Sequence, residues 1–370
     1  TNHHKKPGNE CLMDALAALA AAGIPVQFDR SAEIPALREE VARPVREAAP
    51  TPAGETLSVS GMSVMLPTGN PVGELNEDSF GPILAGENFI KPINSQIRKE
   101  IVDKNVLRLN KTTGEFEKLR ELGEVIQLAG RLGDVDLVGD YGLDSGFVEA
   151  LDTASRLAIA AGVDALRDAG LPLVRKYRKT STGRQLPDRW ALPESLAKRT
   201  GVIFASAFPG VDKLIDEVSR QTASSHAGRT AEELRALLTS LAFKMGDPEE
   251  VKRLTEHFQP TLDELDREGD LYRFNRKFLF WALSMGHAQL AQTIGAKGPN
   301  SAVNAACASG GLAIGVAADW IRLGRCDRVV VVTADDPTSA TMLPWIGAGF
   351  LAAGAATVES EVKEAAVPFG

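Results

Sequence analysis

A strand, a helix and a second strand follow one another near the C-terminal end of the chain, and this succession limits the fold more than any other feature. The first strand is predicted over Ser301–Asn304 and the helix over Ala308–Leu323. The second strand, Val329–Thr333, is β-branched throughout and carries no charge, as a buried strand does. Because a strand–helix–strand unit packs its helix against a sheet, we expect a layered α/β fold.

Four further segments fit this fold class. The helix predicted over Val148–Ala169 has its apolar residues mostly on one face, and a Gly and a Pro follow it closely. Gly201–Ala205 is a short apolar run typical of a buried strand. Residues 211–270 are polar with a helical pattern, so we expect solvated surface helices. A strand is also predicted over Leu57–Met65.

The composition excludes several classes of protein. With 370 residues, 44% of them hydrophobic and 24% charged, the chain is neither disordered nor collagen-like. The net charge of −8 argues against a nucleic-acid binder. Cys11, Cys307 and Cys326 are odd in number and far apart, which favours reduced thiols in the cytoplasm. There is no apolar run of membrane-spanning length, so no membrane span is expected.

The N-terminal 56 residues are predicted to be an upstream segment and a linker, with the main domain over residues 57–370. Residues 11–24 have the spacing of a short helix. Arg43–Thr56 is rich in Pro, Ala and Glu, which is typical of an interdomain linker, with a surface loop as the alternative. Because the chain begins at Thr1 and not Met, we expect it to be a piece of something longer.

The residues around Cys307 indicate a nucleophile on a sharp strand-to-helix turn. Its neighbours Ala306, Ala308, Ser309 and Gly310 are small enough for a tight turn and for close approach of a substrate. A thiol at the first turn of a helix meets the positive end of the helix dipole, which lowers its pKa. The thiolate can then attack a thioester carbonyl while backbone N–H groups stabilise the oxyanion. From these residues alone, a small buried hydrophobic Cys is an equally open interpretation.

The wider pattern resembles a known family. The segment Val303–Gly310, with the small-residue helix after it and Ile321–Asp327, is similar to the active-site region of β-ketoacyl synthases, the condensing domains of fatty-acid and polyketide synthases. Weaker similarities to the N-terminal half of that domain cover Leu57–Ile93, Leu151–Gly170 and Gly201–Ser206. The resemblance therefore extends over roughly Leu57 to Gly370.

This resemblance implies a thiolase-like layered αβαβα fold of two similar halves, usually in a homodimer. It implies that Cys307 accepts an acyl group from a pantetheine thioester and that its own backbone N–H forms half of the oxyanion hole. A malonyl-type extender unit then loses CO2 and attacks the acyl-Cys, which gives a β-ketoacyl thioester. No cofactor is expected to bind directly, since both substrates are carried on the phosphopantetheine of an acyl carrier protein. Residues 12–28 resemble the tail of an acyltransferase domain, which suggests a multifunctional synthase.

The sequence departs from the family pattern in three ways. The family uses two histidines C-terminal to the Cys, whereas this chain has none after His287. It also lacks the family's glycine-rich C-terminal loop, and Pro368–Gly370 resembles the joint between the two halves. Asn304 stands where many members carry Asp. We therefore expect mainly the first half of the fold, with Cys acylation as its most extensive activity.

Two alternatives remain open, namely another acyl-transferring enzyme of the thiolase fold and a non-catalytic dimerisation half. The other candidate residues favour structural roles. His287 is predicted to be a core residue and Cys326 a structural thiol. His226 and His257 have no partners at zinc-ligand spacing, so no metal is expected. No phosphate-binding loop or dinucleotide fingerprint is present either.

Overall fold

The computed structural model describes residues 56–67, 77–110 and 113–365. Its helices and strands belong to one compact unit, Leu57–Gly370. The helix expected over residues 11–24, almost all of the linker and the acyltransferase-like tail lie outside the described residues.

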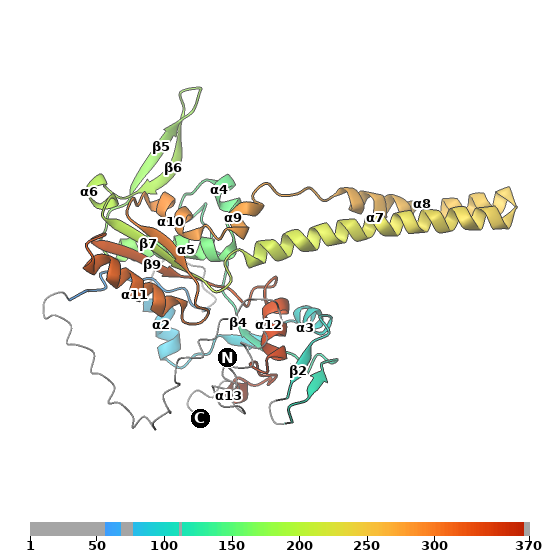
Figure 1. Ribbon diagram of the computed structural model, residues 1–370, viewed down its shortest axis with the longest axis horizontal. Coiled ribbons are helices and arrows are strands. Elements are labelled where there is room, and N and C mark those ends of the chain that lie inside the picture. The colour runs from blue at the N-terminus through green and yellow to red at the C-terminus, as the bar shows by residue number, and fades with distance from the viewer. Residues whose placement is uncertain (1–55, 68–76, 111–112, 366–370) are drawn as a thin grey trace, which may run out of the picture. The chain divides into compact units, whose positions relative to one another are not determined.

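Twelve helices and nine strands make up the described part of the chain (Figure 1). The helices are α2 (Glu77–Leu84), α3 (Ser95–Val102), α4 (Ser145–Glu149), α5 (Thr153–Asp168), α6 (Glu194–Ala197), α7 (Val211–Met245), α8 (Pro248–Asp270), α9 (Phe278–Ala282), α10 (Gly286–Ile294), α11 (Ser309–Arg322), α12 (Leu343–Ala352) and α13 (Val362–Ala365). The strands are β1 (Ile90–Pro92), β2 (Leu107–Leu109), β3 (Phe116–Lys118), β4 (Leu128–Gly130), β5 (Val174–Lys179), β6 (Gln185–Ala191), β7 (Thr200–Ala205), β8 (Asn300–Val303) and β9 (Arg328–Thr333).

A parallel sheet in the order β8–β7–β9 forms the centre of the unit. The register pairs Val202 with both Asn300 and Val330, so β7 is bonded on both sides. All six residues of β7 are buried. The predicted strand–helix–strand succession is confirmed, because β8, α11 and β9 begin and end within a residue or two of their predicted limits.

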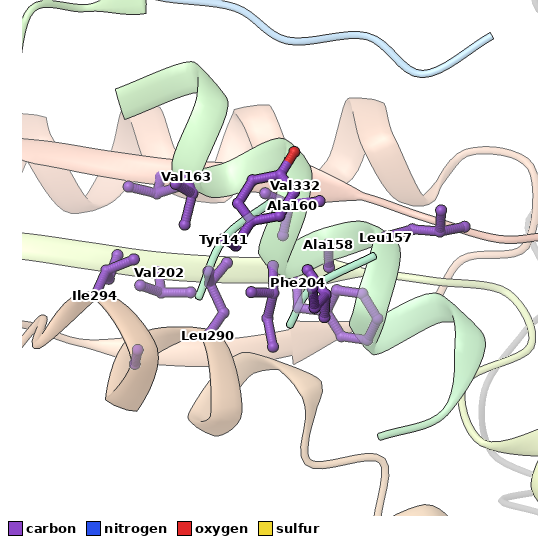
Figure 2. Close-up of a cluster of buried hydrophobic side chains, with 14 of the residues drawn as sticks. Tyr141, Leu157, Ala158, Ala160, Val163, Val202, Phe204, Leu290, Ile294 and Val332 are labelled. Carbon is purple, nitrogen blue, oxygen red and sulfur yellow. The ribbon is translucent and has the colours of Figure 1, made fainter. Parts of the chain in front are cut away.

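The two faces of the sheet pack against different helices. Val202 and Phe204 belong to the large apolar cluster that β7 shares with α5 and α10, and Figure 2 shows Leu290 and Ile294 of α10 lying against them. Ile203 points the other way and packs with the buried residues of α11. Side chains along a strand alternate in direction, so a continuous apolar run such as β7 fills both layers. The described unit is therefore a layered α/β structure.

The predicted helix Val148–Ala169 is divided in two, which corrects the sequence expectation. The short helix α4 ends at Glu149, and α5 begins at Thr153 because Asp152 caps it by accepting a hydrogen bond from the backbone N–H of Ser155. Asp152 is buried, and burial raises the pKa of its carboxyl group. Gly170 ends α5 with a φ of +65°, as a helix-terminating glycine does.

The strand predicted over Leu57–Met65 is wrong. The backbone N–H of Met62 donates to the Asp168 carboxylate at 2.8 Å instead of joining a ladder. Gly61 lies so close to the end of α5 that an added Cβ would be 2.4 Å from the carbonyl oxygen of Ala165. An apolar run becomes a strand only where a partner strand is available, and here a helix end takes that place.

The surface helices predicted for residues 211–270 are confirmed as the antiparallel pair α7–α8. Gly246, with a φ of +68°, lies in the turn between them. Ala231, Leu238 and Leu262 form the small buried core of the pair. At its base the buried carboxylate of Glu217 accepts hydrogen bonds from the Tyr272 hydroxyl and the Asn275 backbone.

Three antiparallel strand pairs, β1–β4, β2–β3 and β5–β6, complete the described structure. The sequence reasoning did not predict them. Within the described ranges, no helix combines the length and the apolar character that crossing a membrane requires.

Candidate active site

Three loops leave the parallel sheet at the same edge, because β7, β8 and β9 run in one direction. Residues 206–210 follow β7, residues 304–308 follow β8, and residues 334–342 follow β9. The Ser206 N–H donates to the carbonyl oxygen of Val303 at 3.3 Å, which holds the first two loops together as they leave the sheet. In α/β folds this carboxyl edge is where ligands bind and catalytic residues gather.

Cys307 lies in the second of these loops and its side chain is exposed. The loop is short, with β8 ending at Val303 and α11 beginning at Ser309. Ala306, directly before the Cys, has a φ of +49°, which is in the left-handed region that residues with a Cβ adopt only at a cost. The sharp strand-to-helix turn predicted for this segment is therefore present. The helix starts two residues after Cys307, so the thiol precedes the first turn and does not lie within it.

Two side chains hold this turn in place. The Ser309 hydroxyl, in a residue only 5% exposed, accepts from the Ala305 N–H at 2.9 Å and donates to the Ala306 carbonyl at 2.6 Å. The Asn304 side chain accepts from the Ala306 N–H at 3.0 Å. Both residues therefore bond to the strained position itself, which explains how an alanine persists there.

The backbone N–H of Cys307 donates no hydrogen bond within the described part of the chain. It lies beside the N-terminal end of α11, where the helix dipole is positive. A free N–H group next to a nucleophile can stabilise the oxyanion that forms when the nucleophile attacks a carbonyl. The turn thus combines an accessible thiol with a hydrogen-bond donor for the developing charge.

Asp335, which the sequence reasoning missed, organises the loop after β7. Its carboxylate accepts hydrogen bonds from the Ser206 hydroxyl at 2.7 Å, the Ala207 N–H at 2.8 Å and the Phe208 N–H at 2.9 Å. The available signal was the pair Asp335 and Asp336, which one residue separates from the predicted strand Val329–Thr333. A side chain at that position can reach the carboxyl edge of the sheet. Asn304 reaches the same loop, because its side chain donates to the Ala207 carbonyl at 3.1 Å.

A cavity of about 340 Å³ lies beside the end of β9, lined by residues that include Met65, Thr333 and Asp336. Thr333 also borders the start of α11, since an added Cβ on Gly310 would be 3.1 Å from its methyl group. Burial raises the pKa of the Asp336 carboxyl group. Thr333 thus borders both the cavity and the first turn of α11.

The other candidate residues are buried or half-buried, or lie on the α7–α8 pair. Cys326 is 1% exposed, and burial raises the pKa of its thiol. His287 lies in the first turn of α10, and burial lowers the pKa of its imidazole. His226 and His257 are exposed on α7 and α8. In the residues that the structure describes, no group of three or more His, Cys, Asp and Glu side chains could hold a metal ion.

Comparison with known families gives a match to the beta-ketoacyl synthase N-terminal domain over residues 216–366. The matched segment contains β8, the turn at Cys307, α11 and β9. The predicted family resemblance is thereby confirmed for this segment, while the resemblance proposed for residues 57–215 lies outside the match. No curated protein matches the chain.

Proposed function

We propose that Cys307 is the acyl-accepting nucleophile of this chain, because residues 216–366 match the β-ketoacyl synthase N-terminal domain and domains of this family are condensing enzymes of the transferase kind. The observation that carries the proposal is the exposed thiol in a strained turn between β8 and α11, beside a backbone N–H that donates to no group in the described residues. The fold proposed for the whole domain is the layered thiolase-like one, of which this chain supplies mainly the first half.

In the first stage the Cys307 thiolate attacks the carbonyl carbon of an acyl-pantetheine thioester. The carbonyl electrons move onto oxygen, and the N–H of Cys307 donates to that oxyanion. The oxyanion then collapses, the bond to the pantetheine sulfur breaks, and the released thiolate takes up a proton. The acyl group is left as a thioester on Cys307.

In the second stage a malonyl-type extender thioester loses CO2, and the resulting carbanion attacks the acyl-Cys carbonyl. The Cys307 thiolate leaves, and the product is a β-ketoacyl thioester. The family assists this stage with two histidines C-terminal to the Cys, and this sequence has no His after His287. The residues of this chain therefore account for acylation, and the decarboxylating groups are proposed to come from elsewhere in the synthase.

The proposed substrates arrive on the phosphopantetheine arm of an acyl carrier protein, and no cofactor is proposed to bind the chain directly. A cytoplasmic homodimer is proposed by the same family argument. The charge supports a protein partner over a nucleic acid, since a net charge of −8 repels a polyphosphate.

The non-catalytic dimerisation half remains a second candidate because of one observation. Leu312 and Ile314 of α11 are 47% and 65% exposed, although they lie on the helix that follows the nucleophile. Two exposed large apolar side chains on one helix, although they point in different directions, favour a partner that covers α11. Such a partner is compatible with catalysis as well, so the thiol must be tested directly.

The test compares Cys307→Ala with Cys326→Ala in the full-length protein, with acyl and malonyl-type thioesters on a carrier protein as substrates. Cys307→Ala is expected to abolish the β-ketoacyl product, and Cys326→Ala to retain it. Product formation by Cys307→Ala at the wild-type rate would refute the nucleophile assignment. Faster acylation from CoA thioesters than from carrier-protein thioesters would instead favour another enzyme of the thiolase fold.

A further inference from the structure

We propose that Asp335 is a positioning residue for the nucleophile turn, which it holds through Ala207 and Asn304. This inference rests on the proposed function of Cys307. Asp335 follows β9, the nucleophile turn follows β8, and Ala207, which links them, follows β7. Hydrogen bonds thus join all three loops at the carboxyl edge of the sheet, and these bonds converge on residues 206–208.

The first link is the set of three hydrogen bonds to one carboxylate. Asp335 Oδ1 accepts from the Ser206 hydroxyl and the Phe208 N–H, and Oδ2 accepts from the Ala207 N–H. Bonds from N–H and O–H donors to an ionised acceptor are shorter and stronger than neutral ones. These three fix the conformation of residues 206–208, which belong to no helix or strand.

The second link runs from this loop to the nucleophile. Ala207 donates its N–H to Asp335, and its carbonyl oxygen accepts from the Asn304 side-chain amide at 3.1 Å. The other atom of that amide, Oδ1, accepts from the Ala306 N–H at 3.0 Å. Asp335 is thus linked through Ala207 and Asn304 to the N–H of Ala306, while Ser309 holds the Ala306 carbonyl.

The position of Ala306 matters because the peptide that follows it carries the N–H of Cys307. Ser309 holds the carbonyl of that peptide, and Asp335 acts on the peptide through the N–H and the φ of Ala306. A change at Asp335 should therefore tilt the N–H that is proposed to face the oxyanion. The thiol itself stays accessible after such a tilt, since Cys307 is exposed. Loss of Asp335 should therefore slow reactions that form an oxyanion and spare reactions that need only the sulfur atom.

Two reagents separate these cases. 4-Nitrophenyl acetate acylates a thiol through a tetrahedral oxyanion and releases 4-nitrophenolate. Iodoacetamide alkylates the same sulfur by displacing iodide, without an oxyanion. Rates of both reactions at Cys307 are measured by peptide mass mapping in the wild type, Asp335→Ala, Asp335→Asn and the matched control Asp336→Asn. Asp336 is the neighbouring carboxyl group and bonds to Thr338, not to residues 206–208.

Asp335→Ala is expected to reduce the rate of acylation about tenfold or more. Removal of an oxyanion-hole N–H slows such reactions strongly, and an N–H that points in the wrong direction should cause part of the same loss of rate. The alkylation rate of this variant is expected to change less than about twofold. Asp335→Asn should be intermediate, since its single carbonyl oxygen can still accept from Ser206 and Phe208. Asp336→Asn should leave the ratio of the two rates unchanged. The buried Cys326 thiol serves as an internal monitor of unfolding, because it is alkylated only when the structure opens.

The proposal is overturned if the ratio of the acylation rate to the alkylation rate is unchanged in Asp335→Ala, whether both rates fall equally or neither falls. Faster labelling of Cys326 would show a purely structural role and would also overturn it. The proposed function fails separately, if wild-type Cys307 reacts with 4-nitrophenyl acetate but not with an acyl-pantetheine thioester. In that case the ratio measured with the two small reagents still decides the role of Asp335.

Discussion

Replacing Ala306 by glycine should stabilise the folded protein, although most Ala→Gly changes destabilise. Ala306 has a φ of +49°, and an L-residue in the left-handed region costs about 1–2 kcal/mol relative to the right-handed one. Glycine lacks this strain but loses about 0.5–1 kcal/mol more backbone entropy on folding. The difference predicts a net gain of about 0.5–1 kcal/mol in the free energy of unfolding.

The matched control is the same substitution inside α11, the helix that follows the nucleophile. Ala318 lies in the interior of α11, where alanine is unstrained, so Ala318→Gly should destabilise by about 0.5–1 kcal/mol. Urea denaturation measures both variants, and a change in midpoint at constant slope reports stability alone. A loss of stability in Ala306→Gly as large as that in Ala318→Gly would refute the strained conformation of the turn.

Three further predictions concern the packing and the charges that support the site. Gly286→Ala should destabilise by about 1–3 kcal/mol, because an added Cβ would be 2.6 Å from the buried ring of Phe204, and differential scanning calorimetry would show the lower melting temperature. Asp212→Ala should lower the free energy of unfolding by about 1–3 kcal/mol, because the buried Asp212 carboxylate accepts from the backbone N–H and the hydroxyl of Thr153. Urea denaturation would measure this loss, and Asp212→Asn should recover part of it. Burial lowers the pKa of His287 below the ordinary imidazole value of about 6.5, so the unfolded chain binds the proton more readily and stability should fall as the pH drops below that value. His287→Gln should make the stability less dependent on pH. A series of denaturation curves across this pH range would contradict the prediction if the stability of both proteins changed equally with pH.

Local patterns predicted the central elements well. β7, α11 and β9 were found within a residue or two because each is a charge-free or small-residue run whose neighbours end it clearly. The Cys turn was predicted from local sequence as well, since the small residues on both sides of Cys307 leave room for a tight turn.

Features that depend on distant partners could not be predicted in this way. Leu57–Met65 has strand-like composition, but its backbone bonds to Asp168, which is more than a hundred residues away in the chain. Asp335 reaches residues 206–208 across a similar separation. One sequence contains no signal for such pairs, so the hydrogen bonds that position the nucleophile emerged only from the structure.

Acylation of Cys307 by a thioester tests the central claim most directly. The protein is incubated with an acyl-pantetheine thioester, digested, and each Cys-containing peptide is examined by mass spectrometry, with Cys307→Ala treated in parallel. We predict an acyl group on the Cys307 peptide, none on the Cys326 peptide and none on the variant. An unmodified Cys307 in the wild type, or equal acylation of wild type and variant, would contradict the account.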